Sequence, residues 1–155
     1  VNDTAGHTAG DRTLAAVAAT LANAVHAVVG ASDAVVARTG GEEFLILATH
    51  REDHELTRRI LDRVRSDCTV TVSIGTVTVD VRPAASDDGA SPATSFASTE
   101  SGGLDQVLDA VVRAADAALY RAKTDGRDRA CHAGTLTISW QGTVQGRQHE
   151  NGRRQ

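Results

Sequence analysis

A short glycine-rich segment between two apolar runs constrains the fold of this chain more than any other feature. The segment is Thr39-Gly40-Gly41-Glu42-Glu43-Phe44, and residues 34–37 before it and 44–47 after it are apolar runs of β-strand type. Two such runs joined by a few residues rich in glycine predict a β-hairpin. Adjacent glycines let the backbone turn sharply and let a ligand approach closely, because no Cβ stands in the way. The sequence therefore predicts a hairpin whose tip carries two carboxylates.

The carboxylates Glu42 and Glu43 admit two interpretations. Like charges side by side repel each other, which costs stability, whereas a pair of carboxylates suits a divalent cation. An acidic, solvated turn is the simpler interpretation, and Gly-Gly-Glu-Glu alone favours it. The rest of the chain favours the metal site.

Length and composition bound the class of protein. The 155 residues suffice for one domain with a substantial core. A net charge of −4 argues against a general nucleic-acid binder, and the longest apolar runs are too short to cross a membrane. Cys68 and Cys131 have neither metal-type nor disulfide-type spacing, which favours a reducing, cytosolic setting. The chain begins with Val1 and contains no methionine, so we expect it to be the C-terminal part of a longer protein.

Periodicity predicts the secondary structure. Apolar residues recur at helical spacing over residues 11–28, 53–65 and 104–122. Alternation predicts a strand over residues 69–74 that continues through residues 77–81, and the change of apolar parity after Gly75 predicts a β-bulge there. Short strands are expected near residues 129–132 and 136–140. Residues 82–103 hold both prolines without any period, which predicts a flexible insertion, and residues 141–155 are expected to be disordered.

Two further clusters carry candidate chemistry. Residues 2–11 form a polar, glycine-punctuated segment that we expect to be a loop leading into the first helix; Asn2 and Asp11 offer the donors and acceptors that suit the edge of a purine. The alternative makes Asp11 a helix N-cap and Asn2 a turn residue. Lys123 and Arg127 close the last helix, where cations complement the helix dipole but also suit a phosphate clamp. Base reader, carboxylate tip and phosphate clamp together indicate a nucleoside triphosphate site.

Four blocks in order resemble the GGDEF domain, the catalytic domain of diguanylate cyclases. They are Val1-Asn2-Asp3 with Gly6-His7, Gly10-Asp11 and Leu14; Arg38-Thr39-Gly40-Gly41-Glu42-Glu43-Phe44; Val72-Ser73-Ile74-Gly75; and Ala115-Asp116 through Tyr120, Lys123 and Gly126-Arg127 to Arg129. The resemblance covers about residues 1–130, and glutamate in the third signature position is a common active variant in that family.

The resemblance implies an α+β fold. Residues 1–132 would form the GGDEF domain, with a central, mostly antiparallel sheet, flanking helices and the palm-like, ferredoxin-like core of nucleotidyl cyclases. The first strand would be missing, because its segment would precede Val1. Residues 133–155 would be a C-terminal extension, largely disordered.

The resemblance also implies residue roles and a reaction. Asn2 and Asp11 would recognise guanine with Leu14 lining its pocket; Gly40 and Gly41 would admit the phosphates; Lys123 and Arg127 would grip the β- and γ-phosphates. Glu42 would bind Mg²⁺ or Mn²⁺ and help deprotonate the attacking 3′-hydroxyl, and Glu43 would support the metal region. The reaction joins two GTP molecules, held by the two halves of a homodimer, into cyclic di-GMP and two pyrophosphates. Catalysis would rest mostly on positioning and charge neutralisation.

The sequence departs from the family pattern in two places. A second metal-binding aspartate of the family's first strand would lie upstream of Val1, so we expect this chain alone to be inactive, although its parent protein is expected to be a cyclase. The segment Gly30-Ala31-Ser32-Asp33 lacks the arginine of the family's Arg-x-x-Asp product-inhibition site. A degenerate module that binds GTP or a partner domain and regulates without catalysis is the alternative, and an enzyme that also accepts ATP is a third. A sensory domain N-terminal to the chain, a cytoplasmic location, and no nucleic acid or membrane contact are also expected.

Overall fold

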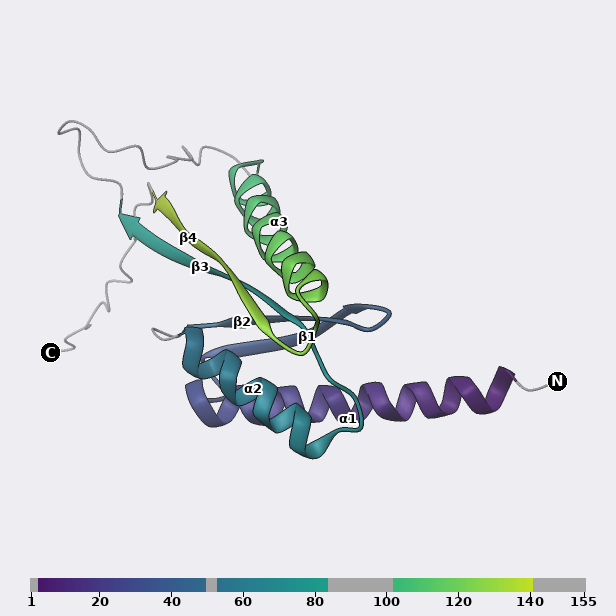
Figure 1. Ribbon diagram of the computed structural model, residues 1–155. Coiled ribbons are helices and arrows are strands. Elements are labelled where there is room, and N and C mark those ends of the chain that lie inside the picture. Colours follow the sequence, from purple (N-terminus) through teal and green to yellow (C-terminus); the bar gives the residue numbers. More distant parts are fainter. Residues whose placement is uncertain (1–2, 50–52, 84–101, 141–155) are drawn as a thin grey trace, which may run out of the picture.

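A computed structural model describes residues 3–49, 53–83 and 102–140 of the chain (Figure 1). Asn2, most of the expected insertion (residues 84–101) and the expected disordered tail (residues 141–155) lie outside the described residues. The elements in chain order are α1 (Asp3–Val29), β1 (Ala34–Gly40), β2 (Glu43–Ala48), α2 (Asp53–Asp67), β3 (Ile74–Pro83), α3 (Gly102–Thr124) and β4 (Ala130–Trp140). Three helices with two small sheets confirm the α+β class.

The core lies between α1 and α2, which run alongside each other (Figure 1). Val17, Leu21 and Val25 of α1 meet Ile60 and Val64 of α2, all almost completely buried. These are the apolar positions that the helical period identified, since one stripe of each amphipathic helix faces the other. The stretch Ala9–Val29 is long and apolar enough to cross a membrane by length and composition alone. We interpret it as a core helix, because its central apolar side chains pack against α2.

The first helix begins earlier than the sequence predicted. The expected loop over residues 2–11 is wrong, because α1 already begins at Asp3. Asp11 therefore lies inside the helix and is not its N-cap. Gly6 and Gly10 each weaken a helix by about 1 kcal/mol relative to alanine, but no proline interrupts the backbone hydrogen bonds between them.

The predicted hairpin is confirmed. β1 and β2 pair antiparallel from Ala34 opposite Ala48 to Gly40 opposite Glu43, with a register shift between Arg38 and Gly40. One face of this pair packs on the helical core through Ala34, Val36, Phe44 and Ile46. Side chains of a β-strand alternate between the two faces of the sheet, so these four side chains lie on one face and hold the hairpin against the helices.

The second sheet differs from the prediction. β3 and β4 pair in parallel, with Ile74 opposite Ala130, and residues 69–73 are not in a strand. The pairing of β3 with β4 cannot extend back toward residue 69, because Ile74 already lies opposite Ala130, the first residue of β4. A register shift lies between Thr76 and Thr78, one residue beyond the bulge expected at Gly75. The parallel direction follows from α3, which connects the two strands and covers one face of them (Figure 1).

The expected single, mostly antiparallel sheet is therefore wrong for the described residues. The four strands form two separate two-stranded sheets, β1-β2 and β3-β4. Both sheets contact the same helical core, since Phe44 and Ile46 of β2 and Ile74 of β3 pack against it. A missing first strand stays a prediction.

A glycine fixes the position of α3 on the second sheet. A Cβ added to Gly75 would collide with the backbone of Ala115 and Leu119, coming within 2.8 Å of the Leu119 Cα. The other end of α3 closes in a Schellman motif: the N–H of Arg127 donates to the Ala122 carbonyl at 3.0 Å, and Gly126 has a φ of +111°. The helix end predicted at Gly126 is thus correct. The close packing of α3 on Gly75 also places the turn that follows the helix.

Candidate functional site

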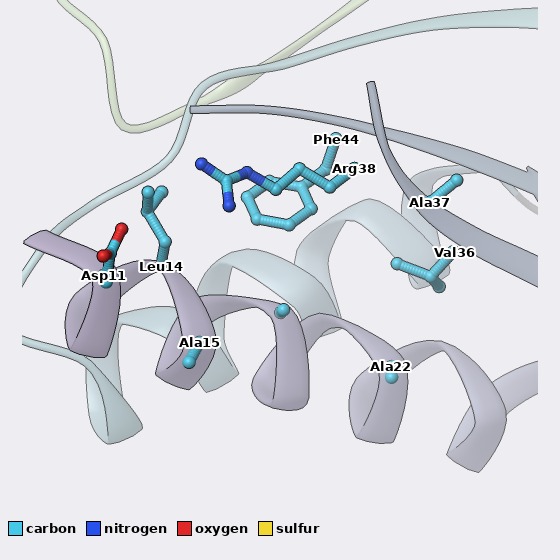
Figure 2. A pocket seen from close by; sticks show the side chains of 9 residues that line it. Asp11, Leu14, Ala15, Ala22, Val36, Ala37, Arg38 and Phe44 are labelled. Carbon is cyan, nitrogen blue, oxygen red and sulfur yellow. The ribbon is translucent and has the colours of Figure 1, made fainter. Parts of the chain in front are cut away.

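A pocket of about 480 Å³ lies between α1 and the hairpin (Figure 2). It is lined by Asp11, Leu14, Ala15, Ala18, Ala22, Val36, Ala37, Arg38 and Phe44. The alanines of α1 keep this groove open, because their side chains end at Cβ. Figure 2 shows the guanidinium of Arg38 directed toward the end of the pocket where Leu14 and Asp11 lie. The pocket thus offers an apolar floor with a carboxylate and a guanidinium at one end, which suits a flat, polar-edged ligand.

Arg38 also braces the hairpin turn. Its Nε donates a hydrogen bond to the Gly41 carbonyl at 2.8 Å, and the Thr39 hydroxyl donates to the Glu43 carbonyl at 3.3 Å. Gly41 adopts a φ of +49°, a left-handed conformation that glycine reaches without steric cost. Among the described residues, no atom beyond the two chain neighbours lies within 4 Å of the place where a Cβ would stand at Gly40 or Gly41. The turn therefore has one braced conformation and open space above its backbone.

The carboxylates of the turn do not complete a metal site within the described residues. Glu42 and Glu43 are both exposed at the hairpin tip. Across residues 3–49, 53–83 and 102–140, no group of three or more His, Cys, Asp or Glu side chains lies close enough together to hold a metal ion. Mg²⁺ in a protein takes six oxygen ligands in octahedral geometry, from one or two carboxylates, water and substrate phosphates. Glu42 can supply one ligand, and the residues described do not fit a resident cation by themselves.

The basic residues at the end of α3 are free to meet an anion. Lys123 and Arg127 are exposed, and in the described part of the chain neither cationic group forms a hydrogen bond or an ion pair. Arg127 and Asp128 both have positive φ values, 60° and 49°. The Arg129 side chain donates to the Arg127 carbonyl at 3.1 Å. Lys123 is thus presented on the last turn of α3, and Arg127 on the following turn, whose backbone conformation is unusual for side-chain-bearing residues.

Arg65 of α2 is a contact of this turn that the sequence patterns missed. Its Nε donates to both carboxylate oxygens of Asp128 at 3.0 Å, and its Nη2 donates to the Asp128 carbonyl at 2.8 Å. The partners are 63 residues apart, and nothing local marks Arg65 among the other arginines of α2. An Asp in the turn after α3 and an Arg at the end of α2 become a recognisable pair only once the fold is known.

The structure brings together part of the predicted site. Asp11 and Leu14 line one pocket with side chains of the hairpin. Glu42, Glu43, Lys123 and Arg127 do not line that pocket, and Asn2 lies outside the described residues. The roles of these residues, and their convergence on one nucleotide, stay predictions. Sequence reasoning also did not assign Arg38 and Phe44 to the pocket, although both lie in the hairpin block; alternation along β1 and β2 would have placed Phe44 on the helix-facing side.

Similarity to known proteins is consistent with these motifs. A family model described as "Diguanylate cyclase, GGDEF domain" matches residues 1–129. A relative named cyclic di-GMP phosphodiesterase PdeR, from Escherichia coli (strain K12), is 33% identical over 134 residues, which are 84% of this chain and 17% of that protein. The chain therefore spans about a sixth of the length of that relative. No solved structure matches the chain. On the family match over most of its length, this chain belongs to the GGDEF domain family.

Proposed function

We propose that this chain is the nucleotide-binding catalytic unit of a diguanylate cyclase, which condenses two GTP molecules into cyclic di-GMP and two pyrophosphates. The observation that carries the proposal is the pocket in which Asp11 and Leu14 of α1 face Arg38 and Phe44 of the hairpin. The pocket joins two of the sequence blocks of the family, and Arg38 in its lining donates a hydrogen bond to the Gly41 carbonyl of the hairpin turn. A base held there would direct its triphosphate along the hairpin tip.

Guanine fits the polar end of this pocket better than adenine. The Watson–Crick edge of guanine presents two adjacent donors, the ring N1–H and the exocyclic amine, and a carboxylate is an acceptor at both oxygens. Asp11 can accept both hydrogen bonds, with Asn2 as the second base-reading residue. Adenine presents an unprotonated ring nitrogen at the same place, which would face the carboxylate without a proton. A site that pairs substrate donors rejects an analogue lacking them by large factors.

The triphosphate would lie against glycine backbone and two cations. The open space over Gly40 and Gly41 leaves room for phosphate oxygens near backbone N–H groups. Lys123 supplies a compact positive charge and Arg127 a planar fork, a pairing that suits the β- and γ-phosphates. These residues act by positioning the nucleotide and neutralising its charge.

Glu42 is proposed as the residue next to the reacting atoms. Its exposed carboxylate at the hairpin tip can accept the proton of an attacking 3′-hydroxyl, and Glu43 would steady the same tip. A Mg²⁺ or Mn²⁺ ion would need ligands beyond the carboxylates described, so no step is assigned to it. The attacking hydroxyl belongs to a second GTP, so the proposal includes a homodimer in which two such pockets face each other. An added strand between the unpaired edges of β2 and β3 would unite the two sheets under this site.

A regulatory module that binds GTP without catalysis is the second candidate. The relative that matches this chain is named a phosphodiesterase, which breaks the product of a cyclase, so the likeness does not by itself favour synthesis. A cytoplasmic location and an N-terminal sensory domain accompany either version of the proposal.

Nucleotide binding and product formation separate these candidates. GTP and ATP affinities are measured by titration calorimetry with Mg²⁺ present, and pyrophosphate release is followed with the 155-residue chain and with a longer form of the protein extended at its N-terminus. A cyclase binds GTP in preference to ATP and releases pyrophosphate in the extended form. Binding without pyrophosphate release from the extended form supports the regulatory module. Equal affinity for ATP and GTP contradicts the role of Asp11.

A further inference from the structure

The turn between α3 and β4 holds two consecutive residues in the left-handed region. Arg127 has a φ of 60° and Asp128 a φ of 49°, and neither is a glycine. Left-handed conformations bring Cβ close to the neighbouring carbonyl oxygen, so they persist in side-chain-bearing residues only when surrounding contacts hold them. Such strained residues cluster at ligand-binding sites. The contacts that hold this turn therefore decide where the Arg127 side chain can point.

One side chain from another part of the chain contacts Asp128 in this turn. Arg65, in the last turn of α2, forms a two-oxygen ion pair with the Asp128 carboxylate at 3.0 Å and a hydrogen bond to the Asp128 carbonyl at 2.8 Å. A planar guanidinium that meets both a carboxylate and a backbone carbonyl fixes the orientation of the peptide as well as its position. Arg65 also approaches Asp62 of its own helix at 3.5 Å, which limits the conformations of its side chain.

We propose that Arg65 is a positioning residue for triphosphate binding: by holding Asp128, it keeps the neighbouring Arg127 where the guanidinium can reach the β- and γ-phosphates. The inference rests on the proposed function, because it requires that Arg127 contacts the nucleotide. The proposal gives Arg65 no contact with the ligand, since its Nε and Nη2 already donate to Asp128 and its Nη1 approaches Asp62. Both members of the pair are partly exposed, at 43% and 38%, so its main effect is geometric and its contribution to global stability is small.

A series of guanine ligands tests the proposal on the full chain. Guanosine and GMP lack the β- and γ-phosphates, and GTP carries them. Arg65→Met should weaken GTP binding about tenfold, because one charge-assisted phosphate contact is misplaced. Its affinity for guanosine and GMP should stay that of the parent. Arg65→Lys keeps the charge but loses the planar fork, so its GTP affinity should lie between those of the parent and of Arg65→Met. Asp128→Asn, which changes the other member of the pair, should also weaken GTP binding without weakening guanosine or GMP binding.

Arg58→Met is the matched control. Arg58 lies on the same helix and pairs with Glu55 at 3.0 Å and Asp62 at 3.1 Å, but it makes no contact with the turn. We expect it to leave all three affinities unchanged. Circular dichroism and urea midpoints establish that each variant is folded before binding is compared.

The outcomes separate the inference from the proposed function. If Arg127→Ala and Lys123→Ala weaken GTP binding but Arg65→Met and Asp128→Asn do not, the proposed function stands and the positioning role is refuted. If Arg65→Met weakens guanosine, GMP and GTP equally, the pair supports only the general structure and the inference is again refuted. If Arg127→Ala leaves GTP binding intact, the phosphate assignment itself is wrong, and the inference fails with it.

Discussion

Gly75 is the position at which the smallest substitution should do the most damage. In Gly75→Ala the new methyl group would face the backbone of Ala115 and Leu119, and its distance to the Leu119 Cα would be 2.8 Å. Backbone atoms cannot rotate away as a side chain does, so β3 and α3 must separate by about 1 Å to reach ordinary contact. Overpacking of this kind costs about 1–3 kcal/mol. Because the clashing atoms of α3 are backbone atoms, we place the cost of Gly75→Ala near the upper end of that range. We expect a loss of about 3 kcal/mol, out of the 5–15 kcal/mol typical of a domain.

Urea and thermal unfolding measure this loss. For a chain of this size, about 3 kcal/mol corresponds to a fall of roughly 6–12 °C in Tm. Gly10→Ala is the matched control, because Gly10 lies within α1 and nothing lies within 4 Å of its added Cβ. That variant should gain about 0.5–1 kcal/mol from helix propensity. An unchanged unfolding midpoint for Gly75→Ala would refute the close approach of β3 and α3.

Four further predictions follow from single side chains. Val64→Ala, at a core position 1% exposed, should lose about 2 kcal/mol in urea unfolding, and a smaller effect than that of an exposed valine would contradict the core. Arg38→Met should weaken GTP binding in calorimetry and change the urea unfolding midpoint little, since the Arg38 hydrogen bond braces the hairpin turn. A lowered midpoint with unchanged GTP affinity would count against the pocket. Glu42→Gln should abolish pyrophosphate release by the extended protein while leaving the Tm unchanged, because Glu42 is exposed; retained turnover would reject its catalytic role. The hydrogen bond from Arg59 holds the pKa of Glu55 below its ordinary 4.5, so Glu55→Gln should cost a small amount of stability at neutral pH. This difference in stability between the variant and the parent should vanish as the pH falls below the pKa of Glu55 in the folded chain. A difference that grows on acidification would contradict the lowered pKa.

The local patterns in this sequence predicted most elements and the pairing within the hairpin, but not the pairing of β3 with β4. The period of α2 and α3 and the glycines between β1 and β2 specify structure within a few residues of themselves, and these elements were predicted within about two residues. The start of α1 was wrong, because glycine lowers helix propensity without forbidding the helix. The expected strand was correct from Ile74 onward and wrong over residues 69–73, because alternation shows which residues suit a strand but not whether a neighbouring strand is present to pair with them.

The candidate site shows the same division. The block around Gly40 and Gly41 and the pair Asp11 and Leu14 were proposed from motifs, and in the structure Asp11 and Leu14 line one pocket with side chains of the hairpin. Arg65 could not be found in this way, because its partner lies 63 residues downstream in a turn whose conformation is set by the fold. Sequence motifs predict groups that would meet a ligand, whereas the contacts between distant segments of the chain are found only with the structure.

These supports also divide the candidate site into two separately fixed halves. The pocket is held by packing of the hairpin on α1, whereas the turn with Arg127 is held by Gly75 under α3 and by Arg65 on α2. A substitution that disturbs the turn with Arg127 should therefore weaken binding of the phosphates more than binding of the base. In Gly75→Ala that remains folded at low temperature, GTP affinity should fall toward that of GMP while guanosine affinity is retained. Equal losses for guanosine and GTP would mean that the two halves move together, and the separate placement of pocket and turn would be wrong.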